Sequence, residues 1–383
     1  MNKKLNKIDK LINELCPEGV EFKELEKVAD VKTGSQLNKT AMFDSGKYLV
    51  LNGGINPSGY YDEYNTEADT IAISQGGASA GYVNFICEKF WAGAHCFVVR
   101  LTNKDVLNKF IYFVLKEGQE KLMQAKLGAG IPGLNRNELR TFKIPIPHLP
   151  IQEEIVKILD NFTELEAELK AELEARKKQY FFYENEILFN NNYELKKISD
   201  LCIVNQGLQI PISERKKESG KNRYFYITIQ FLKKNNGEKY YIENPDKNVI
   251  CKMDDILVTR TGSTGKIITG VEGCFHNNFF KVNCFNIINK RYMYYVLKSK
   301  KIYNKLLHLA SGGTVPDLPH RKFYQIIIPI PPLPLQEEIV KTLDKFDALV
   351  NDISIGLPAE LSVRKKQYEY YREKLLTFNS ITN

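Results

Sequence analysis

The sequence lacks the features of secreted, zinc-binding and membrane-spanning proteins. Its seven cysteines are scattered, odd in number and form no C-x-x-C pair, so they indicate neither a disulfide framework nor a zinc site. No stretch approaches the roughly 18 apolar residues that span a bilayer. The start, MNKKLNKIDKLINEL, is without the apolar segment of a signal peptide. We therefore expect a cytoplasmic chain with reduced thiols and no membrane partner.

Signatures of catalysis are also missing. A methyltransferase acting on amino groups would need an N/D-P-P-Y/F loop, and the nearest string, NPSGY at 56–60, lacks the second proline. A nuclease would need clustered carboxylates for metal ions, and Asp62 with Glu63 form no recognisable set. The five histidines have neither ligand nor triad spacing. We expect a non-catalytic chain with no metal or cofactor of its own. Binding of S-adenosylmethionine by the chain alone would instead support an orphan methyltransferase.

What is present is an ordinary globular composition and a moderate positive charge. Hydrophobic residues make up 43% and charged residues 26% of the 383 residues, which suits two folded domains rather than a disordered chain. The formal net charge of +8 fits either a polyanionic partner or a surface of solvated lysines. Charge alone leaves both interpretations open.

The main feature is an internal repeat. KIPIPHLPIQEEIVKILDNF at 143–162 recurs as IIPIPPLPLQEEIVKTLDKF at 327–346, so Ile144 aligns with Ile328, a shift of 184 residues. RKKQY at 176–180 returns at 364–368, a shift of 188. A period this long indicates two copies of a whole domain rather than a solenoid.

Weaker echoes extend the repeat upstream. The segment FIYFVLK at 110–116 resembles YMYYVLK at 292–298, and ELEKVAD resembles ELKKISD, which pairs Leu25, Val28 and Asp30 with Leu195, Ile198 and Asp200. We predict a domain at 1–150, a helix at 151–190, a second domain at 191–334 and a second helix at 335–383.

The repeat also decides how to interpret GAGIPG at 128–133, a formal match to the dinucleotide-binding pattern G-x-G-x-x-G. The aligned segment keeps Gly312 and Pro316 but has Thr314 and Asp317 in place of Gly130 and Gly133. The glycines also follow an expected helix at about 106–126, not the strand that a phosphate-binding turn requires. We interpret GAGIPG as a turn from that helix into the strand that ends at IPIP.

Each domain is followed by a long helix with a heptad pattern. The helices are expected to start at about Gln152 and Gln336 and to run for about 38–43 residues, or roughly 55–65 Å. Glu166 and Arg176 are polar exceptions on the first apolar seam. In the second helix, Gly356-Leu357-Pro358 and a four-residue insertion predict a local unwinding and a kink.

Helices this long need a partner for their apolar seam, and the duplicate helix is the obvious one. Because a domain lies between them, we expect an antiparallel pair; the alternative is that each helix packs separately on its own domain. The expected helix–helix contacts are Ile155, Leu159, Phe162, Leu169, Leu173, Ile339, Leu343, Phe346, Val350 and Ile353. The predicted fold class is α+β: two similar globular α/β domains joined by two long antiparallel coiled-coil helices, related by a pseudo-twofold internal repeat.

Two variable domains, each followed by I-P-x-P-x-L-P-x-Q-E-E-I-V-K-x-L-D and a long helix, resemble the specificity subunit of type I restriction-modification systems. The ending LDKFDALVNDISIGLPAE…RKKQYEYYREKLLTF is similar to that family's second helical region, and the resemblance covers nearly the whole chain. It implies two target-recognition domains, each reading one half of a bipartite DNA sequence. It also implies spacer helices that set the distance between the half-sites and dock the methyltransferase subunits.

The partners that the resemblance implies are double-stranded DNA and two copies of a methyltransferase (modification) subunit, with restriction (nuclease/translocase) subunits as a further option. S-adenosylmethionine, ATP and Mg are then expected in those partner subunits. The alternative from another class is a coiled-coil scaffold or adaptor without DNA readout, which explains the heptads but not the duplicated domains.

Candidate DNA-binding residues come from matching polar segments of the two domains. The loops SQGGASAG at 74–81 and TRTGSTG at 259–265 combine small residues with a polar side chain that suits a base edge or a phosphate. Other candidates lie in KTGSQLNK, in the basic run at 213–223 and after the Gly-rich turns. The full set is Lys32, Lys39, Gln75, Asn135, Arg136, Arg140, Arg215, Lys216, Lys217, Lys221, Arg223, Arg260, His320, Arg321 and Lys322.

Overall fold

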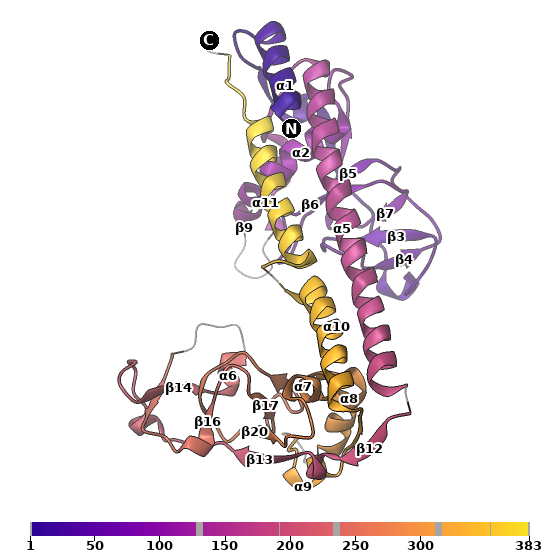
Figure 1. The fold of residues 1–383 in the computed structure, drawn as a ribbon. Helices are drawn as coiled ribbons and strands as arrows, with labels where there is room; N and C mark the ends of the chain where they lie inside the picture. Colours follow the sequence, from indigo (N-terminus) through magenta and orange to yellow (C-terminus); the bar gives the residue numbers. More distant parts are fainter. Residues whose placement is uncertain are drawn as a thin grey trace. The chain divides into compact units, whose positions relative to one another are not determined.

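The computed structural model describes residues 2–127, 133–190, 192–232, 238–310, 316–352 and 354–381. Its contacts divide the chain into two compact units (Figure 1): unit 1 is Met1–Lys170 with Glu360–Asn383, and unit 2 is Ala171–Ala359. Each unit therefore combines one globular domain with segments of both helical regions.

Unit 1 is built on a four-stranded antiparallel sheet and a smaller three-stranded one. The first has the order β2-β8-β5-β6, and all five residues of the inner strand β5 are buried. The second has the order β4-β3-β7, with β3 and β7 parallel. The strands are β2 (Ala29–Thr33), β8 (Cys96–Leu101), β5 (Thr70–Ser74), β6 (Val83–Ile86), β4 (Gly59–Tyr61), β3 (Tyr48–Leu51) and β7 (Phe90–Ala92).

Helices and two short strand pairs complete unit 1. The helix expected at about 106–126 is two helices, α2 (Asn108–Glu117) and α3 (Gln119–Gln124). They are separated by Gly118, where a Cβ atom would lie 2.2 Å from the Phe142 ring. The remaining elements are α1 (Asn2–Leu15), α4 (Arg136–Arg140) and the strand pairs β1 (Phe22–Glu24) with β11 (Lys143–Pro145) and β9 (Lys126–Leu127) with β10 (Gly133–Leu134).

Unit 2 repeats this arrangement. Its main sheet has the order β13-β20-β17-β18, and its second sheet, β15-β14-β19-β16, again contains one parallel pair. The strands are β12 (Glu194–Lys197), β13 (Cys202–Gln206), β14 (Arg223–Ile227), β15 (Tyr241–Glu243), β16 (Ile250–Cys251), β17 (Ile256–Thr259), β18 (Ile267–Ile268), β19 (Gly273–Phe275), β20 (Phe279–Cys284) and β21 (Ile327–Ile330); the helices are α6 (Ile229–Leu232), α7 (Lys290–Lys298), α8 (Lys300–Leu309) and α9 (His320–Tyr324).

The long helices begin slightly before the expected positions. The first is α5 (Leu149–Phe189), and the second is divided into α10 (Leu333–Asn351) and α11 (Leu357–Leu376). Pro150 and Pro334 lie in the first turn, where a missing N–H breaks no helical hydrogen bond. The break between α10 and α11 confirms the interruption predicted at Gly356-Leu357-Pro358.

The glutamine of each QEEIVK copy ties its helix to the globular domain. Gln152 is fully buried; its amide donates to the Pro147 carbonyl at 2.7 Å and accepts from the Leu107 backbone N–H at 2.9 Å. Gln336 does the same, donating to Pro331 at 2.8 Å and accepting from Asn289 at 2.7 Å. These bonds satisfy backbone groups at the starts of α2 and α7. The repeated glutamine is therefore a structural residue.

The helices pair through an aromatic contact that occurs once in each unit. In unit 1 the Phe162 ring of α5 stacks on Tyr371 of α11 at 5.6 Å and lies 6.2 Å from Tyr368. In unit 2 the Phe346 ring of α10 stacks on Tyr183 of α5 at 5.9 Å and lies 6.4 Å from Tyr180. The two phenylalanines are 184 residues apart, and the corresponding tyrosines are 188 apart. The same contact therefore joins residues from both parts of the repeat, those shifted by 184 and those shifted by 188. The paired, antiparallel arrangement is confirmed, and separate packing is wrong (Figure 1).

One part of the sequence alignment is wrong by three residues. Leu25 is fully buried, whereas Leu195, its expected counterpart, is 66% exposed. The backbone N–H of Leu25 donates to Phe142 at 2.9 Å, and the matching bond in unit 2 runs from Ile198 to Ile326 at 2.8 Å. Leu25 therefore corresponds to Ile198. ELEKVAD and ELKKISD align by residue type, but the residues that match by burial and backbone hydrogen bonding are offset by three positions.

Within the described ranges, no helix combines the length and apolar composition needed to cross a membrane.

Candidate nucleic-acid interface

The two polar loops adopt the same backbone arrangement. In unit 1 the Gln75 N–H donates to the His95 carbonyl at 2.9 Å, and the Gln75 carbonyl accepts from Leu134 at 2.7 Å. In unit 2 the Arg260 N–H donates to Asn278 at 2.7 Å, and its carbonyl accepts from Leu318 at 3.1 Å. Gln75 and Arg260 are thus equivalent positions on a duplicated scaffold.

Glycines allow each loop to turn tightly. Gly77 and Gly81 have φ values of +75° and +89°, and Gly262 and Gly265 have +86° and +82°. These left-handed conformations are readily adopted only by glycine. A Cβ at Gly81 would also lie 2.7 Å from the Leu122 backbone. The small residues of both loops are explained by this turn.

Each loop pairs with the first described residues after the Gly-rich sequence. Gly76 forms a β-bridge with Gly133, and Thr261 forms one with Asp317. This confirms the alignment of Gly133 with Asp317. The preceding residues 128–132, which hold most of GAGIPG, lie outside the described residues.

In unit 1 the polar loop lies beside the start of α4 and the end of β2. Asn135 is the N-cap of α4, since its side chain accepts from the Asn137 N–H at 2.9 Å. The Arg136 guanidinium donates to Thr33 Oγ1 at 3.4 Å and lies 5.9 Å from the centre of the Phe97 ring. Lys32, next to Thr33, is exposed and lies 3.4 Å from Asp30. The structure therefore gathers Thr33, Gln75, Asn135 and Arg136, whereas Lys32 lies on the opposite face of β2 from Thr33.

In unit 2 the corresponding loop contains a bidentate arginine–aspartate ion pair. Arg260 Nε and Nη2 donate to Asp317 Oδ1 and Oδ2 at 2.7 and 3.1 Å, and Nη1 lies 3.5 Å from Gln206 Oε1. The Gln206 and Asp317 side chains were not among the predicted site residues.

A sequence signal for Gln206 existed in the repeat. VKTGSQL at 31–37 matches VNQGLQI at 204–210, which aligns Thr33 with Gln206. The glycines that follow are required in both copies, because a Cβ at Gly34 would lie 2.1 Å from the Ala92 carbonyl oxygen and one at Gly207 would lie 2.3 Å from that of His276.

The start of α9 adds three predicted residues. The His320 ring packs edge-on against Phe280 at 4.9 Å, and its Nε2 is buried without a partner among the described residues. Burial, with a smaller effect of the Arg260 charge, lowers the pKa of His320. Arg321 is exposed, and Lys322 Nζ donates to the Leu309 carbonyl at 3.0 Å.

The basic run at 213–223 is tied to the second sheet of unit 2. The Arg215 guanidinium donates twice to the Ile210 carbonyl, at 2.9 and 2.7 Å, and lies 4.9 Å from the centre of the Tyr226 ring. Lys216 pairs with Tyr241 through the backbone, while Lys217 is 3.8 Å from Glu238, Arg223 is 3.2 Å from Glu243 and Lys221 is exposed.

Two unit 1 candidates lie apart from the polar loop. Arg140, at the end of α4, pairs with Glu26 at 2.6 Å. Lys39 is exposed in a single turn of 3-10 helix, Lys39–Ala41. Among the residues described, no three His, Cys, Asp or Glu side chains are placed to hold a metal ion.

The predicted helix–helix residues fall into the two units' cores. Ile155, Leu159 and Phe162 are buried in unit 1, and Ile339, Leu343 and Val350 in unit 2. Leu169, Leu173 and Phe346 are half-buried, and Ile353 lies outside the described residues.

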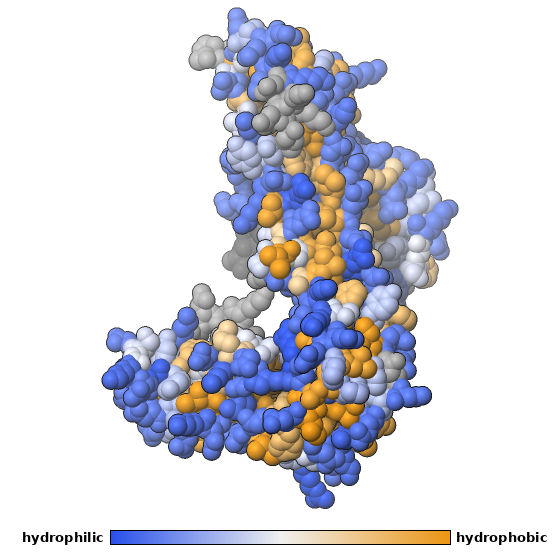
Figure 2. Space-filling model, viewed as in Figure 1, coloured by the Kyte–Doolittle hydropathy of each residue, from blue (hydrophilic) through white to orange (hydrophobic). Residues whose placement is uncertain are grey.

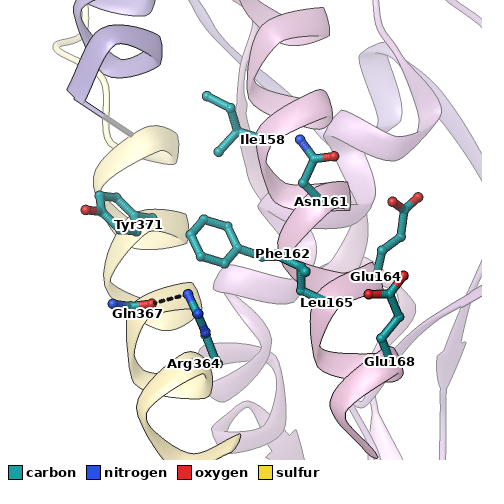
Figure 3. Close-up of a pocket in the computed structure, with 9 residues that line it drawn as sticks. All are labelled: Ile158, Asn161, Phe162, Glu164, Leu165, Glu168, Arg364, Gln367 and Tyr371. Carbon is teal, nitrogen blue, oxygen red and sulfur yellow. Dashed lines mark hydrogen bonds between the residues drawn. The ribbon is translucent and has the colours of Figure 1, made fainter. Parts of the chain in front are cut away.

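The paired helices of unit 1 leave an open groove of about 520 Å³ between α5 and α11 (Figure 3). Phe162 reaches across it toward Tyr371, and Arg364 donates to Gln367 at 3.5 Å on the α11 side. Leu165 is exposed at its edge, beside Glu164 and Glu168. In Figure 2, hydrophobic residues are exposed along the region between α5 and α11.

Known proteins match this chain along its length. The profile of the type I restriction modification DNA specificity domain matches residues 17–175 and again residues 190–363. A Haemophilus influenzae protein named as a type I restriction enzyme specificity subunit is 32% identical over 381 residues, covering 94% of this chain and 96% of that protein. The EcoR124I/EcoR124II specificity subunit of Escherichia coli is 33% identical over 259 residues, covering 62% of this chain and 63% of that protein.

The fold is also similar to a solved structure. The S subunit of a type I restriction-modification system from M. genitalium superposes with a TM-score of 0.61 at 22% identity. The superposition covers 94% of this chain and 96% of that one.

Proposed function

The chain belongs to the type I restriction-modification DNA specificity family, and we propose that its two units each read one half of a bipartite DNA site. It is the DNA-recognition component and not a catalytic one, in line with relatives that are named specificity subunits. Methyl transfer, and any cleavage, is then the work of other subunits.

The observation that carries this proposal is the duplicated scaffold with different side chains on it. Equivalent backbone positions hold Thr33, Gln75 and Arg136 in unit 1 and Gln206, Arg260 and His320 in unit 2. Side chains of these types read base edges, and loops rich in glycine let the backbone approach a duplex. One scaffold with two side-chain sets suits two half-sites of different sequence.

Exposed lysine and arginine side chains in both units are suited to bind the phosphates of the DNA backbone. Lys32 on β2 of unit 1, Arg321 on α9 of unit 2 and Lys221 on the basic run are all exposed. Contacts of this kind fix the register of a protein on DNA without reading its sequence. Arg215 has a different role in this proposal: its bonds to Ile210 hold the basic run in place.

The helices are proposed to set the half-site separation and to dock the methyltransferase subunits. Exposed apolar side chains recur at equivalent places: Leu165 on α5 matches Leu349 on α10, and Phe182 on α5 matches Tyr370 on α11. A surface present once in each unit favours one partner type bound twice. The unit 1 groove between α5 and α11 lies on this helical surface.

The wider complex follows from the same family membership. We propose two copies of a modification subunit, with restriction subunits as optional partners. S-adenosylmethionine, ATP and Mg would be bound by those subunits. The cytoplasm, where the DNA lies, is the expected location.

Methylation mapping of DNA from cells that express this chain with its methyltransferase subunit tests the proposal. A bipartite consensus with a fixed spacer is expected. The scaffold or adaptor alternative predicts that methylation and duplex binding have no sequence preference that depends on this chain.

A further inference from the structure

Arg260 and Asp317 form an ion pair at the polar loop of unit 2, and unit 1 has Gln75 and Gly133 at the equivalent positions. Both Asp317 carboxylate oxygens accept from the planar fork of donors on the Arg260 guanidinium, from Nε at 2.7 Å and from Nη2 at 3.1 Å. The side chains remain 36% and 33% exposed, so the fork meets solvent. An exposed pair of this kind adds little to stability. Its effect is to fix the direction of a flexible side chain.

Asp317 occupies only the Nε/Nη2 edge of the guanidinium, and the Nη1/Nη2 edge has a single long bond, to Gln206. Asp317 takes the Nε–H and one Nη2–H, and arginine has five donors in a planar arrangement. Nη1 has Gln206 Oε1 at 3.5 Å, too long for a strong hydrogen bond. The Nη1 and Nη2 hydrogens that point away from Asp317 form the pair that matches guanine O6 and N7.

We propose that Arg260, positioned by Asp317, reads a guanine in the half-site bound by unit 2. The inference rests on the proposed DNA-reading function and specifies one base of its target.

Unit 1 offers a built-in contrast at the same backbone position. Gln75 replaces Arg260, and Gly133 replaces Asp317, so neither the guanidinium nor its carboxylate support is present. A Cβ at Gly133 would lie 3.4 Å from the Gln75 carbonyl oxygen, which shows that the two positions face each other here as well. Glutamine pairs with adenine N6 and N7 instead. The other half-site is therefore expected to carry an adenine where this one carries a guanine.

The test uses the full chain in complex with its methyltransferase subunit and a library of duplexes with randomised bases, with methylated sequences read out. The unchanged complex should show a guanine at one position of one half-site. Arg260→Gln should shift that position to adenine or relax it, with the guanine preference falling about tenfold or more. Asp317→Asn should weaken the same preference, and both variants should leave the other half-site unchanged.

Arg291→Gln is the matched control, because Arg291 forms an arginine–aspartate pair with Asp344 at 2.8 Å in the same unit, between α7 and α10. It should leave every position of the consensus as it was. Arg260→Lys keeps the charge but loses the planar fork that Asp317 positions, so it should weaken the guanine preference while retaining folding and DNA affinity.

The outcomes separate the two levels of inference. A wild-type complex without sequence preference overturns the proposed function itself. A wild-type bipartite consensus that persists unaltered in folded Arg260→Gln, Arg260→Lys and Asp317→Asn complexes overturns the guanine assignment alone. Should Arg260→Gln fail to fold, the Arg260→Lys and Asp317→Asn results decide.

Discussion

At the scale of single residues, equivalent positions of the two units have kept their backbone and changed their side chains. The buried glutamines Gln152 and Gln336 are unchanged because each satisfies the start of a neighbouring helix. Gln75 and Arg260 differ although their backbone hydrogen bonds are the same. The buried glutamines that anchor the helices are thus identical in the two copies, and Gln75 and Arg260, which are proposed to face DNA, differ.

Arg321 is the clearest single cation to remove. It is exposed at the start of α9, beside the segment that pairs with the unit 2 loop. Arg321→Ala in the methyltransferase complex should weaken duplex binding by about 1–3 kcal/mol if it makes a bidentate base contact. If Arg321 contacts a phosphate instead, its removal should weaken binding equally for all sequences. The slope of log affinity against log salt concentration should then fall by about one. Titrations at several salt concentrations distinguish these cases, and unchanged affinity and slope would exclude Arg321 from the interface.

Glu184 is expected to make the stability of unit 2 depend on pH. Burial raises the pKa of this carboxyl, Asp347 adds to the effect, and Lys298 and the hydrogen bond from Tyr180 oppose it. Because the folded pKa is raised, the folded state binds the proton more tightly. The free energy of unfolding should therefore fall as the pH rises from the ordinary glutamate range through the raised pKa.

Glu184→Gln should remove that loss, since the amide oxygen still accepts from Tyr180 and carries no charge to bury. We expect the variant to be more stable than wild type at neutral pH and similar to it under acid conditions. Denaturant unfolding across this pH range measures the difference. A parallel pH dependence in both proteins would contradict the assignment to Glu184.

At the scale of elements, the helices are assigned to units by what they pack against. α11 comes from the end of the chain and yet pairs with the first part of α5 in unit 1, and Arg372 of α11 also pairs with Glu117 at 2.5 Å. In unit 2 the later part of α5 meets α10 through the same kind of aromatic contact. Unit 1 is thus completed by a helix from a distant part of the sequence, whereas the two helical segments of unit 2 directly flank its domain.

Phe162→Ala should destabilise unit 1 strongly. The ring is buried between α5 and α11, and deleting a buried phenylalanine ring costs about 3–5 kcal/mol. Phe346→Ala should cost less, because Phe346 is only half-buried. Val363→Ala, at an exposed position of α11, is the control and should leave the unfolding transition in place. Equal stability of Phe162→Ala and wild type would show that the aromatic contact does not hold α11.

At the scale of the whole molecule, the functional question is how two readers act on one duplex. α5 continues without interruption from residues of unit 1 into residues of unit 2. The net charge of +8 favours a polyanion without specifying its sequence. The proposed specificity therefore comes from the two polar loops, and the proposed spacing from the helices between them.

Adding one heptad near residues 163–170 and another near 347–352 tests the role of the helices. Seven helical residues add about 10 Å, which corresponds to roughly three base pairs. Methylation mapping of such a double insertion should reveal a changed spacer between half-sites, with both half-site sequences intact. A changed half-site with the original spacer would contradict the proposal.

Sequence alone predicts the duplication, the long helices, the break at Gly356-Leu357-Pro358 and the two polar loops. These features are local or repeated, so periodicity, glycine and proline placement and self-comparison reveal them. Sequence alone also predicts, as candidate site residues, Gln75, Asn135, Arg136, Arg260 and His320. The alignment of Leu25 with Leu195 is wrong, because a short charged string carries no information on burial.

Contacts between residues far apart in the sequence are visible only in the folded chain. Asp317 lies 57 positions after Arg260, and Gln206 lies 54 positions before it, yet all three side chains come together at one loop. The same holds for Phe162 and Tyr371, which pair across more than half of the chain. Such contacts depend on strand order and helix pairing, which are fixed by the packing of the whole core rather than by any local pattern.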